Sequence, residues 1–185
     1  MDTIKNDIMK FNKDIVEFHI PRWEELPDIE LYMDQVITFI ENNLSIYPFI
    51  NNEKIITSSM INNYVKLNLI PKPVKKKYNK THLAYLIAIS ILKHVFTIQE
   101  VKDGILFQAM ISGEKDAYNL FCEEQELALK YITEQINGED KTSASTMNIT
   151  SENLMIKMST LSFASKIISE KTIGLQKCFM EQNEE

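Results

Sequence analysis

The sequence is poor in the residue types from which most enzyme active sites are assembled. Its four glycines are isolated from one another, so neither a phosphate-cradling loop nor a dinucleotide fingerprint is present. The three histidines and two cysteines show no His-x-x-x-His or Cys-x-x-Cys spacing, and no acidic pair has the spacing of metal ligands. We therefore expect a protein that is not an enzyme and that has no metal site and no cofactor.

Export and membrane signals are equally scarce. The first seven residues do not place a basic segment before an apolar one, which predicts that there is no signal peptide. The apolar run of residues 83–89 is much too short to cross a bilayer. Cys122 and Cys178 lie far apart without neighbouring ligands or redox partners, as is typical of reduced thiols. These features predict a cytoplasmic protein with no membrane partner.

Negative charge is absent from one quarter of the chain. Residues 54–99 contain eight lysines and no aspartate or glutamate, whereas the other residues carry 12 basic against 26 acidic side chains. Positive charge confined in this way indicates a partner, and the commonest such partner is a phosphate backbone. The alternative interpretation is a lysine-bearing face that only contacts water.

The first half of this basic region predicts a short helix followed by a loop. Residues 57–60 (TSSM) predict a helix start with a hydroxyl cap ahead of Met60, and Asn68 stands where a left-handed residue ends a helix. A basic loop, residues 69–78, follows because its two prolines cannot continue the helix. We expect the end of this loop, from Val74 onward, to be extended.

The second half of the basic region predicts two further helices. Asn79 can cap a helix that is apolar nearly all round over residues 83–89 and is therefore expected to be buried. Thr97 and Glu100 have the spacing of a capping box that opens the next helix.

This order of elements resembles the winged helix-turn-helix of MerR-type transcription regulators, over roughly residues 56–105. In that family the helix before the wing recognises DNA and the wing grips phosphate, so the resemblance implies that the chain binds double-stranded DNA. It implies DNA contacts from Ser58, Ser59, Asn62, Asn63, Tyr64 and Lys66 in the helix, and from Lys72, Lys75, Lys76, Lys77, Tyr78 and Lys80 in or beside the wing.

A second, more specific resemblance involves two separate segments. Residues 21–28 (PRWEELPD) and 58–66 (SSMINNYVK) are similar to a bacterial family catalogued only as a domain of unknown function, DUF1836. That family has no established activity.

The scarcity of arginine bears on how such a helix would recognise bases. Arg22 is the sole arginine, so the rigid bidentate fork that reads guanine is missing from the helix and the loop. Asn62 and Asn63 carry amides that can pair bidentately with adenine, which predicts a site that favours A·T pairs. The alternative is that both asparagines only face water.

Helices are also expected before the basic region. Residues 4–18 carry apolar side chains every three or four positions, which predicts an amphipathic helix that either docks on the protein's own core or exchanges between subunits. Trp23, between two prolines, is expected to anchor the connector that follows. Asp28 can cap a helix whose apolar positions run from Ile29 to Leu44.

From Glu100 to the end the chain turns acidic, with 15 acidic against eight basic side chains. A helix of about six turns is expected to end near Gly138, with a water-facing acidic run at residues 123–126. A polar connector over residues 138–150 and a last helix from Leu154 complete the prediction.

The sequence therefore predicts an all-α, mainly helical protein with a MerR-like winged helix-turn-helix, a small basic wing and a helical C-terminal region. Its expected parts are an N-terminal arm and connector (1–27), the DNA-binding domain (28–112) and a dimerisation or effector region (113–185). We predict a sequence-specific DNA-binding transcriptional regulator, whose partners would be DNA, a second copy of the chain and an unidentified small-molecule effector. The alternative is a protein-interaction module of helix-turn-helix shape that binds an acidic protein partner.

Overall fold

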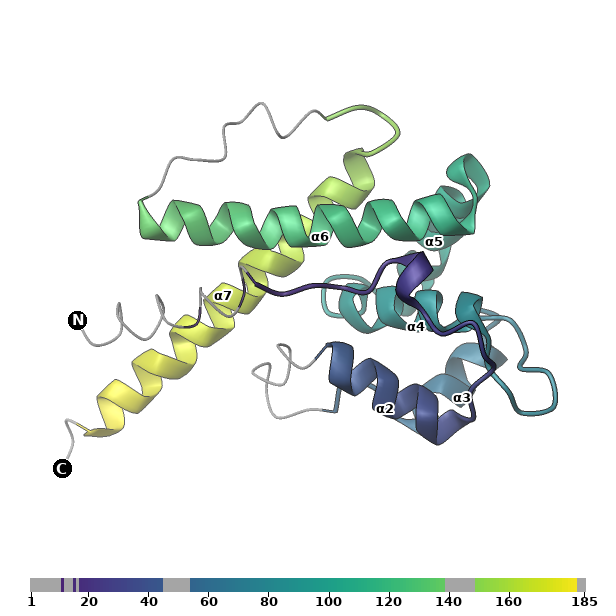
Figure 1. Ribbon diagram of the computed structural model, residues 1–185. Helices are drawn as coiled ribbons and strands as arrows, with labels where there is room; N and C mark the ends of the chain where they lie inside the picture. Colours follow the sequence, from purple (N-terminus) through teal and green to yellow (C-terminus); the bar gives the residue numbers. More distant parts are fainter. Residues whose placement is uncertain (1–10, 12–14, 16, 45–53, 139–148, 183–185) are drawn as a thin grey trace. The chain divides into compact units, whose positions relative to one another are not determined.

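The computed structural model describes residues 11, 15, 17–44, 54–138 and 149–182 (Figure 1). Within these ranges the chain is mainly helical, as predicted. The β pairing there consists of two isolated antiparallel bridges, Leu31–Tyr78 and Val74–Lys77. None of the described helices has both the length and the apolar character needed to cross a membrane. The elements are the 3-10 helix η1 (Trp23–Glu25) and the α-helices α2 (Met33–Asn43), α3 (Ser58–Lys66), α4 (Lys80–Leu92), α5 (Ile98–Ser112), α6 (Glu114–Asn137) and α7 (Leu154–Gln182).

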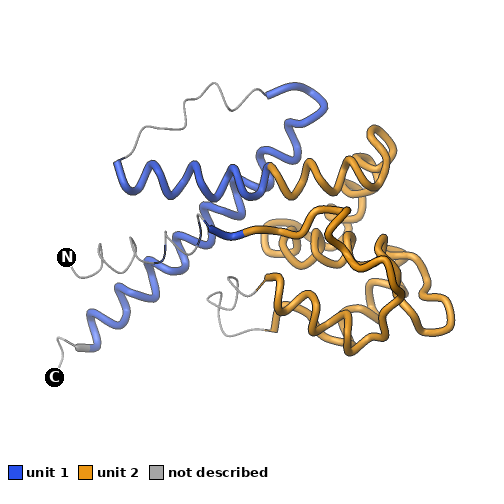
Figure 2. Tube along the Cα trace, viewed as in Figure 1, with its two compact units in different colours: residues 1–18, 49–52, 124–185 blue, residues 19–48, 53–123 orange. Residues whose placement is uncertain are grey.

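The chain forms two compact units, coloured separately in Figure 2. Unit 1 comprises residues 1–18, 49–52 and 124–185, and unit 2 comprises residues 19–48 and 53–123. These limits do not coincide with the predicted domain boundaries after residues 27 and 112. The connector falls in unit 2, and the limit between the units lies inside α6.

Unit 2 is built around α4, which is buried on most of its circumference. The Asn79 side chain caps this helix by accepting a hydrogen bond from the His82 backbone N–H, at 3.2 Å. Helix α4 packs against α2 and α5, so its apolar residues have neighbours on several sides. This confirms the prediction of a capped, buried helix. Its buried apolar residues are Leu83, Ala84, Leu86, Ile87, Ala88, Ile89, Ile91 and Leu92.

The connector is fastened to the beginning of α6, which explains why it belongs to unit 2. The Tyr118 hydroxyl donates to the Pro21 carbonyl at 2.7 Å, and the Trp23 backbone N–H donates to Asn119 Oδ1 at 2.8 Å. The rings of Trp23 and Tyr118 lie edge to face with centroids 6.4 Å apart. Trp23 is thus an anchor, as predicted.

Helix α2 begins later than the sequence predicts. Leu31 and Tyr78 exchange two backbone hydrogen bonds of 2.8 Å, which hold the residues before the helix in extended conformation. The helix therefore begins at Met33, where the Gln35 side chain accepts a hydrogen bond from the Tyr32 N–H. Asp28, the predicted cap, is instead ion-paired with Lys80.

Unit 1 contains the second part of α6 together with α7, and its interior includes an ion pair. Lys157 Nζ lies 2.7 Å and 2.8 Å from the two carboxylate oxygens of Glu124, and both side chains are largely buried. The prediction that residues 123–126 form only a water-facing acidic run is therefore wrong for Glu124. A helix alone cannot reveal that a lysine 33 positions away lies opposite this face.

The terminal predictions are only partly within the described residues. Phe11 and Ile15, from the predicted N-terminal helix, are helical and buried, and Lys171 Nζ lies 5.3 Å from the centre of the Phe11 ring. The rest of the predicted 4–18 pattern, apart from Phe18, and most of the 138–150 connector lie outside the described residues. Gly138, with φ of 70°, follows the end of α6 as predicted.

Candidate nucleic-acid interface

Helix α3 is defined at both ends by its own sequence. Thr57 Oγ1 accepts a hydrogen bond from the Met60 backbone N–H at 3.2 Å, which satisfies an otherwise unpaired donor of the first turn. At the other end Asn68 takes φ of 51°, and the Leu69 N–H donates to the Tyr64 carbonyl at 2.9 Å. The predicted cap and the predicted left-handed terminus are both confirmed.

The outward face of α3 carries polar side chains and no carboxylate. Successive polar positions are separated alternately by one and three residues, which places them together on one side of a helix. Ile61, on the opposite side, is fully buried. Helix α3 therefore presents hydroxyl, amide and ammonium groups from a firmly packed base. The exposed residues of this face are Ser58, Ser59, Asn62, Asn63 and Lys66.

Two tyrosines of the predicted interface are buried instead of facing outward. Tyr64 is 4% exposed and Tyr78 is 3% exposed, and burial raises the pKa of both phenols. Tyr64 lies on the same side of α3 as Ile61, because the two positions are three residues apart. Tyr78 packs edge to face on His82, with ring centroids 5.3 Å apart. Both rings therefore lie beneath the exposed surface on which the sequence analysis placed them.

Lysines from other elements fasten the two ends of α3. Lys93, which follows α4, donates through Nζ to the Ile55 carbonyl, just ahead of the helix. Lys102, in α5, donates to the Leu67 carbonyl at 3.0 Å, just after it. A positive charge at a helix C-terminus is favourable because the exposed carbonyls there carry partial negative charge. These two lysines have structural roles, and the basic region of the sequence did not distinguish Lys93 from its neighbours.

The basic loop, residues 69–78, contains a tight two-residue turn at Lys75 and Lys76. The prediction that the loop is extended from Val74 onward is therefore wrong at these two residues. Lys75 and Lys76 have φ of 50° and 63°, and the Lys77 N–H donates to the Val74 carbonyl at 2.9 Å. Positive φ at both central residues is the pattern of a type I′ hairpin turn, which Asn-Gly forms most easily. Lysine has a Cβ that makes this backbone unfavourable. Both side chains are exposed at the tip of the loop.

A buried histidine lies beneath the end of the loop. His82 Nδ1 accepts a hydrogen bond from the Asn79 backbone N–H at 3.1 Å, which completes a reciprocal capping box with the Asn79 side chain. Burial lowers the pKa of the His82 imidazole, because a charged ring would be poorly solvated there. The neutral ring keeps Nδ1 available as an acceptor and gives Tyr78 an apolar surface on which to pack.

The lysines of the predicted interface fall into two groups. Lys66, Lys72, Lys75 and Lys76 are exposed and form no ion pair within the part of the chain that the structure describes. Lys77 Nζ lies 4.0 Å from Glu30 Oε2 and 5.7 Å from the centre of the Tyr32 ring. Lys80 Nζ lies 2.5 Å from Asp28 Oδ1 and is only 19% exposed. The sequence placed all six together because it could not show where the acidic residues of 28–30 lie.

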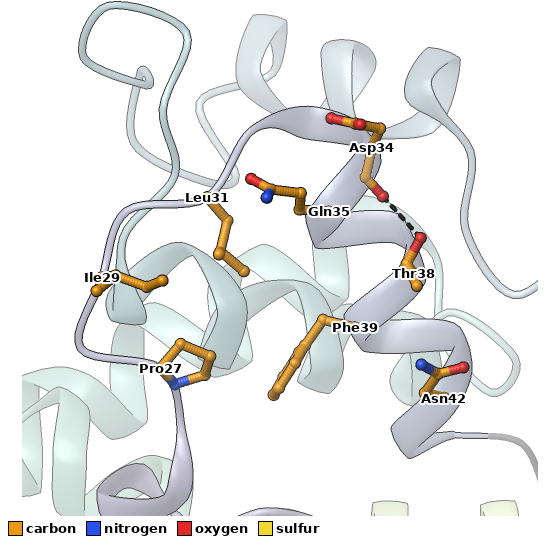
Figure 3. A pocket seen from close by; sticks show the side chains of 8 residues that line it. All are labelled: Pro27, Ile29, Leu31, Asp34, Gln35, Thr38, Phe39 and Asn42. Atoms are coloured by element: carbon orange, nitrogen blue, oxygen red, sulfur yellow. Dashed lines mark hydrogen bonds between the residues drawn. The ribbon is translucent and has the colours of Figure 1, made fainter.

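A shallow groove that the sequence analysis missed lies between segment 27–31 and helix α2. Figure 3 shows its apolar side chains coming from this segment and from Phe39, and its polar ones from α2. Its volume is about 380 Å³. The spacing of apolar residues in the sequence does not predict this groove, because its two walls come from an irregular segment and a helix. The lining residues are Pro27, Ile29, Leu31, Asp34, Gln35, Thr38, Phe39 and Asn42.

Fold and surface together define a mainly helical protein with a short polar helix and a lysine-tipped loop displayed beside it. The chain belongs to the family described as a domain of unknown function (DUF1836), whose profile matches residues 21–131. This confirms the more specific resemblance, and the match includes both segments that carried it. No curated protein matches the chain, and no solved structure matches it either.

Proposed function

We propose that this protein is a sequence-specific DNA-binding transcriptional regulator, in which α2, α3 and the basic loop act as a MerR-like winged helix-turn-helix. In this proposal α3 enters the major groove, where Asn62 and Asn63 discriminate bases and favour adenine. The exposed lysines of the loop neutralise phosphates and set the orientation of the helix. A cytoplasmic location and the absence of catalysis are parts of the same proposal.

The observation that carries the proposal is the turn at Lys75 and Lys76. A non-glycine residue in the left-handed region costs on the order of 1 kcal/mol or more. Two successive lysines adopt this unfavourable conformation at a turn that Asn-Gly would form with less strain. Strained backbone concentrates at functional sites. A role for the two exposed ammonium groups accounts for their presence at this tip, and phosphate is the ligand that such groups bind most commonly.

The test is binding of the full chain to mixed duplex fragments over a salt series. Lys75→Gln/Lys76→Gln should bind all sequences roughly tenfold more weakly at moderate salt, and the salt slope should fall by roughly 0.9 for each lost phosphate contact. Glutamine keeps a polar, unbranched side chain and the backbone strain, so the main change is the loss of charge. Lys130→Gln/Lys177→Gln removes the same charge from exposed positions in unit 1 and should leave binding unchanged.

Two results would contradict the proposal. One is a wild-type chain that binds no duplex at about 50 mM salt, where phosphate contacts are strongest. The other is a loop variant that binds as well as the control variant. Replacing Asn62 or Asn63 by Ala should change sequence preference more than affinity, and a selected-site pool dominated by G·C contacts would exclude the proposed role of the two amides.

A second candidate function is binding of an acidic protein partner through the same surface. Two exposed apolar side chains lie among the lysines, since Leu67 is 47% and Val74 is 64% exposed. Apolar side chains beside basic ones suit a protein surface better than a phosphate backbone. Leu67→Ser/Val74→Ser should weaken binding to such a partner and leave DNA binding unchanged, and unrelated duplex DNA should not displace the partner.

Homodimerisation and an effector remain further proposals. Helix α5 exposes four apolar side chains on one face, which supports pairing with a second copy of the chain. The groove beside α2 combines apolar side chains with amide, hydroxyl and carboxylate groups, a composition that supports binding of a small molecule. The exposed residues on α5 are Leu106, Phe107, Met110 and Ile111.

A further inference from the structure

Residues 28–32 and the end of the basic loop are joined side by side by several different contacts. Two backbone hydrogen bonds of 2.8 Å connect Leu31 with Tyr78. Next to this bridge, Asp28 Oδ1 lies 2.5 Å from Lys80 Nζ and Glu30 Oε2 lies 4.0 Å from Lys77 Nζ. The bridge fixes the register, so each carboxylate is held next to the lysine that it pairs with.

The two pairs divide the lysines of the loop and of the start of α4 into available and paired ones. Lys75 and Lys76, at the tip, can accept a phosphate without losing a carboxylate partner within the described residues. Lys77 and Lys80 must first leave a tethered carboxylate. A phosphate contact at these two positions exchanges one anion for another, so its net contribution to binding is small.

We propose that Asp28 and Glu30 are internal competitors of phosphate, which lower the affinity of this surface for polyanions of any sequence. The inference rests on the proposed DNA-binding function and concerns its selectivity. Non-specific DNA binding consists almost entirely of phosphate contacts, so it experiences the full effect of the competition. Because a genome offers roughly 10⁶–10⁹ non-specific sites, a lower affinity for them leaves more protein free to find its own site.

The test compares two double variants of the full chain that have the same net charge. Asp28→Asn/Glu30→Gln removes both carboxylates and releases Lys77 and Lys80. Asp34→Asn/Glu41→Gln removes two exposed carboxylates of α2 that form no ion pair in the described part of the chain. Each protein is eluted from heparin with salt and is then titrated with non-specific duplex DNA over a salt series.

The first variant should elute from heparin at higher salt than both the wild-type chain and the α2 variant. Its affinity for non-specific duplex should rise by about two- to fivefold for each lysine released, which is the range that measured exposed ion pairs imply. Adding Lys77→Gln/Lys80→Gln to this variant should abolish the gain, because the two released lysines are the groups that bind the polyanion.

Equal elution of the two charge-matched variants would overturn the inference, because charge alone would then explain any change. A gain that persists after Lys77→Gln/Lys80→Gln is added to the first variant would overturn it too, because the released lysines would then not be its cause. Different results would refute the inference and the proposed function. A wild-type chain that does not bind DNA refutes the function, whereas heparin elution still reports whether the two carboxylates restrain the lysines. A purely structural role of the pairs would lower the unfolding midpoint without raising polyanion affinity.

Discussion

The interiors of the two units differ in polarity. The interior of unit 2 is formed mainly by α4 and the apolar side chains around it. Its buried polar side chains among the described residues are His82, Ser90 and Gln108, and burial lowers the pKa of the His82 imidazole. The interior of unit 1 contains the Glu124–Lys157 pair and a fully buried glutamine, Gln125. Neither polar atom of the Gln125 side chain has a hydrogen-bond partner among the described residues.

This difference bears on how each unit is stabilised. Apolar packing around α4 has no strict orientation requirement, and the contacts of Lys93 and Lys102 with the two ends of α3 add to it. Buried polar groups stabilise a unit only where every partner is in place. The family match covers nearly all of unit 2 and ends in α6 at Tyr131, so most of unit 1 lies outside it. The apolar scaffold is thus the part that this chain has in common with its family.

The largest change in stability is expected from Lys157→Met in unit 1. The substitution leaves the Glu124 carboxylate buried without its partner, which should cost about 3–5 kcal/mol of unfolding free energy. Urea unfolding of the full chain, followed by circular dichroism, measures it. Glu124→Gln/Lys157→Met removes both charges and should recover most of the loss. If the single variant were as stable as the wild-type chain, the pair would not be part of the unit 1 interior.

A smaller effect of opposite sign is expected from Gln125→Met. Methionine has a similar shape and no polar groups, so it removes the penalty of two unpaired buried atoms and should stabilise the chain by about 1–3 kcal/mol. Gln108 in α5 is also buried but has an interaction partner, so Gln108→Met should give no such gain. Loss of stability on Gln125→Met, measured by the same urea unfolding, would show that this amide is satisfied in solution.

The smallest effect expected is a pH dependence in unit 2. Below about pH 6.5 the unfolded chain binds a proton at the His82 imidazole that the folded chain does not bind, because burial lowers the pKa of this group. Stability from this residue is therefore lost as the pH falls through 6.5 toward the lowered pKa, by at most about 1.4 kcal/mol per pH unit.

His82→Gln isolates this dependence. Glutamine is a favoured partner in a capping box and can still accept the Asn79 N–H, but it does not titrate. Unfolding free energies measured between pH 7.5 and pH 5 should fall less steeply in the variant than in the wild-type chain. Equal slopes would show that other groups cause the acid sensitivity and that protonation of His82 does not contribute to it.

The sequence by itself determined the helices of the basic region and their ends. Thr57, Asn79 and Thr97 each cap the helix predicted for them, and Asn68 takes the left-handed conformation expected after α3. The burial of α4 also followed from its apolar circumference. These features depend on groups three or four residues apart, so the local pattern contains the interaction that produces them.

Only the tertiary structure decided which basic and polar residues are available at the surface. The burial of Tyr64, the fastening role of Lys93 and the pairing of Lys80 with Asp28 all depend on elements distant in sequence. The late start of α2 has the same origin, because the bridge from Leu31 to Tyr78 holds its leading segment extended. A charge count treats all lysines alike, whereas the partner of each lysine is chosen by how the chain folds back on itself.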